Sequence, residues 1–257
     1  MIAVTRPVSP TLPRCELTHL VREPIDVTRA AAQHAEYERL LETLGVTVVR
    51  VPAAPQLPDA VFVEDIAVVL DEIAVITRPG ATSRRDESAA VATTLAAYRP
   101  LRTMTAPATL DGGDVLRLGR TLHVGRSART NEEGIEQLRS LVASFDYQVV
   151  ETAFAGCLHV KSAVTAIADG LLLLNPAWVA ATAFPGCDAV CVDDREPHAA
   201  NALRIGATIV FPAHHPRTLE RLTAHGLRVE TVECDELAKA EGAVTCCSLV
   251  IVERAPI

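Results

Sequence analysis

The sequence predicts a single-domain α/β fold, a closed fivefold propeller of pseudosymmetric ββαβ modules. Its 257 residues suffice for one large core, and a composition of 49% hydrophobic and 22% charged residues excludes general disorder. Two strand-like segments, an amphipathic segment and a third strand-like segment recur in this order at intervals of about 45 residues. One copy is divided between the chain ends, so pairing of its two parts would close a ring.

Four modules are complete and follow one another along the chain. Each reads as a strand pair, a helix and a third strand, at residues 60–80, 83–99 and 101–107; 111–130, 131–145 and 147–154; 159–176, a poorer helix at 176–184, and 188–194; and 200–211, 215–226 and 227–234. The sequence therefore predicts helices that alternate regularly with small sheets.

The fifth module is split between the termini. Its first strand is predicted at 245–254, its second at 2–7, its helix at 26–45 and its third strand at 46–52. Pairing of the first strand with the second removes the exposed sheet edges that an open arrangement would leave. We therefore expect one domain over residues 1–257, and an open α/β sandwich is the alternative architecture.

Composition limits the classes of function. A net charge of −8, 4% aromatic residues and the lack of a Lys/Arg cluster argue against a nucleic-acid partner and favour a cationic ligand, although the charge also serves solubility. The longest apolar run is broken by Asn175 and Pro176, and the N-terminus lacks a signal-peptide pattern, so we expect a cytoplasmic protein without a membrane partner. Seven cysteines without CxxC spacing predict reduced thiols and no zinc site.

Residues that can do chemistry recur at the first strand of successive modules. They are Glu64 and Asp65, Asp111, His159, the less reactive Asn201, and Cys246. Equivalent positions of a ring meet near its axis, so a thiol, an imidazole and several carboxylates would converge, as nucleophilic catalysis requires. Each residue alone has an ordinary structural explanation. Their shared register favours a site, because polar groups at one end of successive strands are costly to bury.

Strand alternation separates the adjacent thiols Cys246 and Cys247. In the run TCCSLVIV, Cys247 shares a face with Leu249 and Ile251, which predicts a position in the core. Cys246 shares the opposite face with Ser248. Cys246 is therefore the candidate nucleophile.

The carboxylates around Cys246 indicate a guanidinium substrate. Nearby negative charge disfavours a thiolate, and a bound cation reverses this effect. A guanidinium is planar, permanently charged, able to bind a carboxylate in bidentate fashion, and has an electrophilic carbon. Arg84 and Arg129 are candidate anchors for a carboxylate elsewhere on the ligand, although both also read as surface arginines at helix starts.

Five ordered motifs carry a family resemblance. The segments PDAVFVEDIAVV, ITRPGATSRRDE, LDGGDVLRLGRTLHVGRSARTNEEG, CLHVKS and GAVTCCSLVI resemble the dimethylarginine dimethylaminohydrolases, which belong to the guanidine-modifying superfamily with its fivefold propeller. The resemblance implies hydrolysis of asymmetric dimethylarginine and monomethylarginine to citrulline and an alkylamine. The implied route passes through a covalent cysteine thiouronium and needs no metal or organic cofactor.

The resemblance also implies residue roles. Cys246 would be the nucleophile, His159 the general acid and base, and Asp111 the carboxylate that orients it; the substrate residues would be Asp65 and Glu64 at the guanidinium, Asp59 near the head group, Phe62 in the pocket wall, Arg84 and Arg129 at the α-carboxylate, and Leu20 in a mobile lid. Asp111 stands where some bacterial relatives have Glu. The stretch 175–216 offers no site residue.

Two other functions stay open from sequence. A deiminase acting on arginine or agmatine would carry a carboxylate two residues after the catalytic histidine, where this chain has Lys161. The second alternative is a protein without catalytic activity, either a ligand-binding protein or a redox sensor that uses the thiols of Cys246 and Cys247. A disulfide between these adjacent residues would be strained, because strand alternation points their side chains apart. The oligomeric state is also open, with a homodimer as one candidate.

Overall fold

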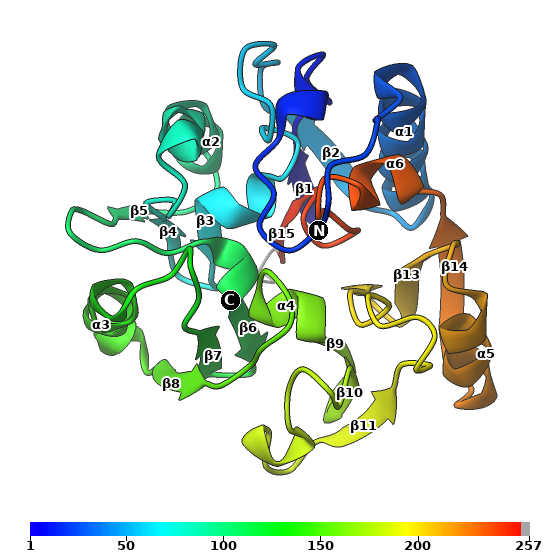
Figure 1. Ribbon diagram of the computed structural model, residues 1–257. Helices are drawn as coiled ribbons and strands as arrows, with labels where there is room; N and C mark the ends of the chain where they lie inside the picture. Colours follow the sequence, from blue (N-terminus) through cyan, green and yellow to red (C-terminus); the bar gives the residue numbers. More distant parts are fainter. Residues whose placement is uncertain (253–257) are drawn as a thin grey trace.

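Small three-stranded sheets follow one another around the centre of the molecule in the computed structural model, which describes residues 1–252 (Figure 1). Within those residues there are five such sheets. In each sheet the middle strand is antiparallel to one neighbour and parallel to the other. This is the strand order that the recurring sequence pattern predicts.

The strands are short and their order in each sheet is the same. The sheets consist of β3 (Ala67–Val69), β4 (Ala74–Ile76) and β5 (Leu101–Thr103); β6 (Val115–Leu118), β7 (Thr121–Gly125) and β8 (Gln148–Thr152); β9 (Val164–Ala168), β10 (Leu171–Leu174) and β11 (Asp188–Cys191); β12 (Leu203–Ile205), β13 (Thr208–Pro212) and β14 (Arg228–Val232); and β15 (Leu249–Ile251), β1 (Ile2–Thr5) and β2 (Thr47–Arg50). Of the first-listed strands, β3, β6, β9 and β15 lie toward the centre in Figure 1.

The last sheet joins the two ends of the chain. Strand β15 pairs antiparallel with β1, where Val4 faces Leu249, and β1 pairs parallel with β2. The predicted last strand was too long, because residues 244–247 form a turn and 253–254 lie outside the described residues. Cys246 and Cys247 therefore lie in a turn, and the alternation argument that separated them rested on a wrong local structure.

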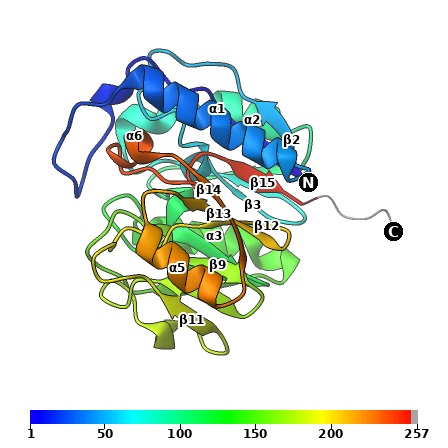
Figure 2. The same ribbon diagram turned by 90° about the vertical axis from the view of Figure 1, so that its right-hand side faces the viewer.

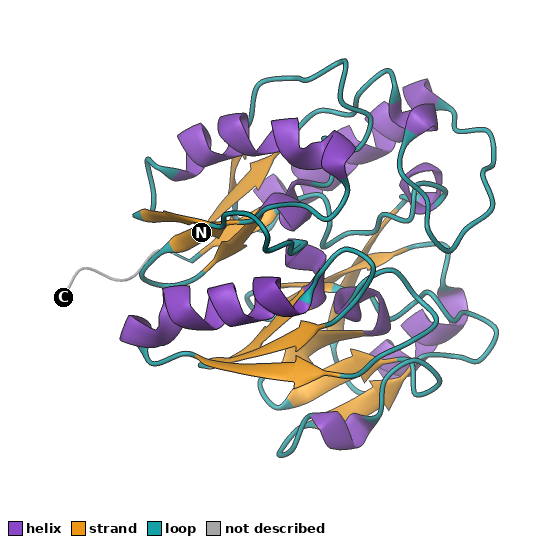
Figure 3. Ribbon diagram, turned by 60° about the vertical axis from the view of Figure 1, so that its left-hand side comes forward, coloured by secondary structure: helices purple, strands orange, loops and turns teal. Residues whose placement is uncertain are grey.

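One or two helical segments lie between the middle and third strand of each sheet. These segments are α1 (Val27–Thr43), α2 (Ser88–Leu95) after the 3₁₀ segment η3 (Thr82–Glu87), α3 (Glu132–Val142) followed by η5 (Ala143–Phe145), the 3₁₀ turn η6 (Ala181–Ala183) and α5 (Pro216–Ala224). The longer helices lie outside the sheets (Figures 1 and 3). None of the helices in residues 1–252 has both the length and the apolar character needed to cross a bilayer.

Helix α3 illustrates why these segments are helical. Asn131 caps its N-terminus by accepting a hydrogen bond from the Gly134 N–H at 2.8 Å. Ile135, Leu138 and Val142 recur on one side and are buried against the sheet. The third module lacks such a pattern, which explains why its predicted poor helix is only the short η6.

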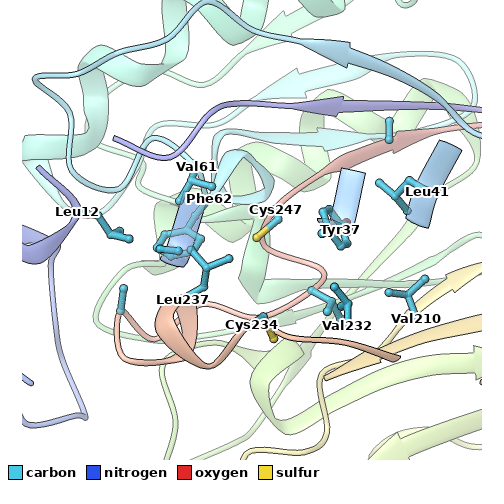
Figure 4. Packing of buried hydrophobic residues seen from close by; sticks show 14 of the residues in the cluster. Leu12, Tyr37, Leu41, Val61, Phe62, Val210, Val232, Cys234, Leu237 and Cys247 are labelled. Atoms are coloured by element: carbon cyan, nitrogen blue, oxygen red, sulfur yellow. The ribbon is translucent and has the colours of Figure 1, made fainter. Parts of the chain in front are cut away.

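Buried residues form clusters between neighbouring modules. Figure 4 shows one cluster, in which Cys247 lies among Tyr37, Phe62 and Leu237. Leu249 and Ile251 belong to a different cluster, with Val4 and Ile76. The prediction that Cys247 is buried in the core is thus confirmed, although its neighbours differ from those expected.

Short helical turns precede the central strands and carry the polar residues. They are η2 (Val63–Ile66) before β3, η4 (Gly112–Asp114) before β6 and α4 (Val160–Ala163) before β9. The sequence pattern placed these residues within strands. The turns instead expose backbone N–H groups to the carboxylates, as when Val160 donates to Asp114 at 3.1 Å.

Two further helical segments lie near the chain's ends in sequence. These are η1 (Leu12–Arg14) and α6 (Asp235–Ala238). Figure 2 shows the dark blue segment before α1 projecting beside α6, away from both termini. The segment and the last loop of the chain therefore meet at one end of the molecule.

Candidate active site

Asp65, Asp111 and His159 come from three successive modules and meet in the interior. The three side chains each offer an oxygen or nitrogen atom within 4.8 Å of the others. Gly113 lies between them, and a Cβ there would stand 2.5 Å from His159 Nδ1 and 2.7 Å from Asp65 Oδ1. The LDGGD motif therefore needs glycine at 113 so that the imidazole and the carboxylate can approach.

His159 is surrounded by carboxylates. Its Nε2 lies 3.2 Å from Asp111 Oδ2, and its Nδ1 lies 3.7 Å from Asp65 Oδ1. Burial disfavours the imidazolium, but Asp65, Asp114 and Asp111 outweigh burial and raise the His159 pKa to about 9. The imidazole is therefore protonated at neutral pH, which makes it a proton donor.

Asp65 is held in its ionised form. Arg84 Nη1 donates to its Oδ2 at 2.5 Å and the Gly113 N–H to its Oδ1 at 3.0 Å. Burial opposes ionisation, but His159 and Arg84 prevail and lower the Asp65 pKa to about 2. Asp65 thus lies between two cations, and a metal ion bound by Asp65, Asp111 and His159 would have to displace the imidazolium proton.

Asp111 is fully buried. Its Oδ1 accepts a hydrogen bond from the Gly80 N–H at 3.0 Å, and its backbone N–H donates to the Thr130 hydroxyl at 3.2 Å. Arg129 Nη1 lies 4.0 Å from its Oδ2. These contacts fix the carboxylate against the His159 ring.

Cys246 occupies a turn that is tied to the first module. Its N–H donates to Ala243 O at 3.2 Å, and its carbonyl accepts the Glu64 N–H at 3.1 Å. Burial, followed by the charges of Glu64 and Asp65, raises the pKa of its thiol above the ordinary range. The resting state therefore pairs a neutral thiol with an imidazolium.

Glu64 has internal partners for both carboxylate oxygens. Lys161 Nζ donates to Oε1 at 2.5 Å, and the Thr245 hydroxyl donates to Oε2 at 2.7 Å. Asn201 donates to the same hydroxyl at 2.9 Å and accepts the Thr245 N–H at 3.0 Å. The network joins four modules beside Cys246.

Arg84 and Arg129 differ in how much of their hydrogen-bonding capacity is used. Arg84 donates to both oxygens of Glu87, at 3.1 and 2.9 Å, besides its bond to Asp65 and two bonds to the carbonyls of Phe62 and Asp59. Arg129 Nη2 donates to the Thr18 hydroxyl at 3.2 Å. Arg84 thus makes five hydrogen bonds within the protein, whereas Arg129 uses few of its donors.

Two adjoining cavities reach Cys246. The smaller has a volume of about 20 Å³, and its walls include most of the expected site residues: Asp59, Phe62, Asp65, Arg84, Arg129, His159 and Cys246. The larger has a volume of about 620 Å³, and Leu20 lines it. Leu158, Glu241, Gly242 and Cys246 belong to both. The smaller cavity can hold about one water molecule, so an amino acid could enter only after its walls move.

Asp59 and Phe62 lie where the N-terminal segment covers the smaller cavity. Both oxygens of Asp59 lie 3.2 Å from the Glu16 N–H, and burial raises the Asp59 pKa to about 6. The Phe62 ring packs so tightly on Gly242 that a Cβ there would lie 2.1 Å from it. Phe62 therefore helps to fix the loop that leads to Cys246.

Several functional residues were missed from sequence. Asp114 accepts hydrogen bonds from Ser127 at 2.6 Å and Thr130 at 2.7 Å and adds to the charge that raises the His159 pKa. Its position in the LDGGD motif, three residues after Asp111, was a sequence signal that could have identified it. Glu87 pairs with Arg84 within one short helical turn, and Thr245 bonds to Glu64 and Asn201 from other modules. Neither residue belongs to a sequence pattern that would have marked it.

Comparisons with known proteins agree with this geometry. The model of the family described as "N,N dimethylarginine dimethylhydrolase, eukaryotic" matches residues 20–175. A dimethylarginine dimethylaminohydrolase of Streptomyces coelicolor is 39% identical over 249 residues, which cover 96% of this chain and 95% of that protein. One from Pseudomonas aeruginosa is 32% identical over 87% of this chain and 89% of its own length.

A solved structure of the Pseudomonas aeruginosa enzyme, a cysteine-to-serine variant in complex with citrulline, has the same fold. Its TM-score is 0.92 at 30% sequence identity, with 96% of this chain and 98% of that chain covered. The shared fold, the family model and the identity over nearly the whole chain agree. This protein belongs to the dimethylarginine dimethylaminohydrolase family.

Proposed function

We propose that this protein hydrolyses asymmetric dimethylarginine and monomethylarginine to citrulline and an alkylamine. The observation that carries the proposal is the smaller cavity, whose walls combine the Cys246 thiol, the His159 imidazole and the Asp65 carboxylate. A nucleophile, a proton donor and an anion are the groups that attack on a guanidinium carbon requires. Family membership supports the same reaction.

The guanidinium binds next to Asp65. That carboxylate is ionised and keeps acceptor capacity beyond its bonds to Arg84 and Gly113. Glu64 was expected to share this contact, but its bonds to Lys161 and Thr245 support a role in holding the turn of Cys246. The bound cation offsets the negative charge that raises the thiol pKa, so substrate binding promotes the thiolate.

Cys246 and His159 then act in two steps. The thiolate attacks the guanidinium carbon, and His159 gives its proton to the departing dimethylamine as the carbon–nitrogen bond breaks. A thiouronium links Cys246 to the substrate. The neutral imidazole next takes one proton from water, whose oxygen adds to the same carbon. The carbon–sulfur bond then breaks and the remaining hydroxyl proton passes to the sulfur, which releases citrulline and restores the neutral thiol and the imidazolium. Asp111 keeps the imidazole oriented through its contact with Nε2.

The amino-acid end of the substrate lies under the N-terminal segment. Arg129, which retains donors, binds the α-carboxylate, and Asp59 lies near the α-ammonium group. Arg84 supports this end through Asp65 and the carbonyls of Phe62 and Asp59. Leu20 covers the bound substrate from the larger cavity.

The fold and its surroundings complete the proposal. We assign the five sheets to a closed propeller, supported by the pairing of β15 with β1. The seven cysteines are all free thiols, which supports a reducing, cytoplasmic location.

A substrate panel tests the proposal. Citrulline release is measured from asymmetric dimethylarginine, monomethylarginine, arginine and agmatine. The proposal predicts a higher kcat/KM for the methylated arginines than for arginine, because Lys161 stands where a deiminase has a second acid, and poor turnover of agmatine, which lacks the carboxylate. Arginine or agmatine turned over as fast as asymmetric dimethylarginine would assign the protein to the deiminases. No turnover with intact ligand binding would favour a silent binding protein.

A further inference from the structure

One carboxylate holds the segment that covers the smaller cavity. We call residues 16–22 the lid. The N–H groups of Thr18, His19 and Leu20 all donate to Glu241, to Oε2 at 3.0 Å and to Oε1 at 2.5 and 2.7 Å. These bonds join residues more than 200 positions apart in sequence, and hydrogen bonds to an ionised acceptor are the stronger kind.

Glu241 occupies a backbone position that favours glycine. It follows α6 with a φ of 59°, while its N–H donates to Ala238 O at 3.0 Å and the Gly242 N–H donates to Leu237 O at 3.1 Å. This is the Schellman ending of a helix, in which a residue other than glycine is strained. Position 241 is nevertheless a glutamate, and its side chain is the group that binds the lid.

The lid has further ties, and two of them lead to residues that line the smaller cavity. Glu16 donates its N–H to Asp59, and the Thr18 hydroxyl accepts from Arg129. Glu241 itself lines both cavities and stands five residues before Cys246. The lid and the nucleophile's loop are therefore connected through this one side chain.

We propose that Glu241 is a positioning residue that closes the lid over Cys246. Both oxygens of its carboxylate are engaged by lid N–H groups, so it acts on the reaction through the lid. Closure reduces the space at the reacting groups to about 20 Å³. Release of these bonds must then accompany substrate entry and product release, whereas their formation encloses the substrate beside Cys246 and His159.

The decisive variant is Glu241→Gly, which removes the carboxylate and at the same time relieves the strained backbone. Glu241→Gln keeps one acceptor oxygen and should be intermediate. Glu233→Gln, at an exposed acid before α6, is the matched control. Amide hydrogen exchange of residues 16–22 is followed by mass spectrometry on the whole protein, with residues of β7 as the internal reference.

We expect exchange in the lid to be at least about tenfold faster in Glu241→Gly, with β7 unchanged and the melting temperature not lowered. Trypsin should also cleave faster after Arg22. The kinetic arm rests on the proposed function: kcat/KM for asymmetric dimethylarginine should fall about tenfold or more, while Glu233→Gln stays at the wild-type value. Lid exchange within twofold of wild type in Glu241→Gly would overturn the proposal. Exchange decides it even if the wild-type protein does not turn over methylated arginines, an outcome that would refute only the proposed function.

Discussion

Lys161 and Glu64 form an ion pair beside the turn of Cys246, with Nζ 2.5 Å from Oε1 and side chains only 17% and 9% exposed. The pair explains what a lysine does two residues after the histidine. It neutralises a carboxylate beside the thiol, and in the proposed reaction it leaves Asp65 as the anion that binds the guanidinium. The other carboxylate oxygen of Glu64 accepts a hydrogen bond from the hydroxyl of Thr245, the residue before Cys246.

Replacement of Lys161 by Met should destabilise the protein by about 3–5 kcal/mol, because it leaves Glu64 buried and unpaired. The double variant Lys161→Met/Glu64→Gln should recover most of that loss, since it removes the uncompensated charge. Urea unfolding of the wild type, both single variants and the double variant measures the coupling. Additive losses would show that the two side chains do not interact.

The adjacent thiols should respond differently to the same change. Cys246→Ser should abolish turnover, because a hydroxyl is a poor nucleophile at neutral pH. Cys247→Ser should keep most activity and lose about 1–3 kcal/mol of stability, since it buries a hydroxyl in the apolar cluster of Figure 4. Steady-state rates with circular dichroism as the folding control decide this, and equal loss of activity in both folded variants would contradict the assignment.

The pH dependence follows from the two raised pKa values. The reactive form needs a Cys246 thiolate and a His159 imidazolium, but the thiol pKa lies above the His159 pKa of about 9. Between pH 6 and about 9, kcat/KM should therefore rise about tenfold per pH unit and then level off as the imidazolium is lost.

Asp111→Asn supplies the control for that profile. Loss of this carboxylate lowers the His159 pKa, so the rise should end at a lower pH than in the wild type. A wild-type profile that falls between pH 6 and 8 would mean that neutral His159 is the active form. That result would contradict the protonation states derived from the geometry.

Substitution of Arg129 should affect substrate binding, whereas substitution of Arg84 should affect the stability of the fold. Arg129→Ala should mainly raise KM, because the α-carboxylate contact is similar in the ground and transition states. Arg84→Met should instead lower stability by about 3–5 kcal/mol, since Asp65 and Glu87 lose their buried partner. Kinetics and urea unfolding of each variant test this. A stable Arg84→Met variant with a raised KM would instead indicate that Arg84 binds the substrate's α-carboxylate directly.

Much of the architecture could be predicted from sequence because each module repeats a local pattern. Apolar alternation and helix periodicity revealed the ββαβ order, and the shared register of Asp65, Asp111 and His159 indicated that they would meet. Short-range signals sufficed there, because equivalent positions of repeated modules converge. The split module was also visible, since its two parts keep the same pattern.

The turns and the long-range bonds could not be predicted. The strand pattern gave no sign that Cys246 lies in a turn, because turn formation depends on the Asn201 and Glu64 contacts from other modules. Glu241 carried no sequence signal, because its three lid partners are more than 200 residues away. The extensive hydrogen bonding of Arg84 within the protein likewise depends on Glu87 and on backbone carbonyls that carry no side-chain signature.

The central claim is that Cys246 forms a covalent bond to the guanidinium carbon, and His159→Gly with S-methyl-L-thiocitrulline tests it most directly. Methanethiolate leaves without a proton donor, so the first step proceeds, whereas water is no longer activated for the second. Intact-protein mass spectrometry after acid quenching should show an added mass equal to the compound less methanethiol, and peptide mapping should locate it on Cys246. The absence of any adduct, or an adduct on another residue, would contradict the mechanism.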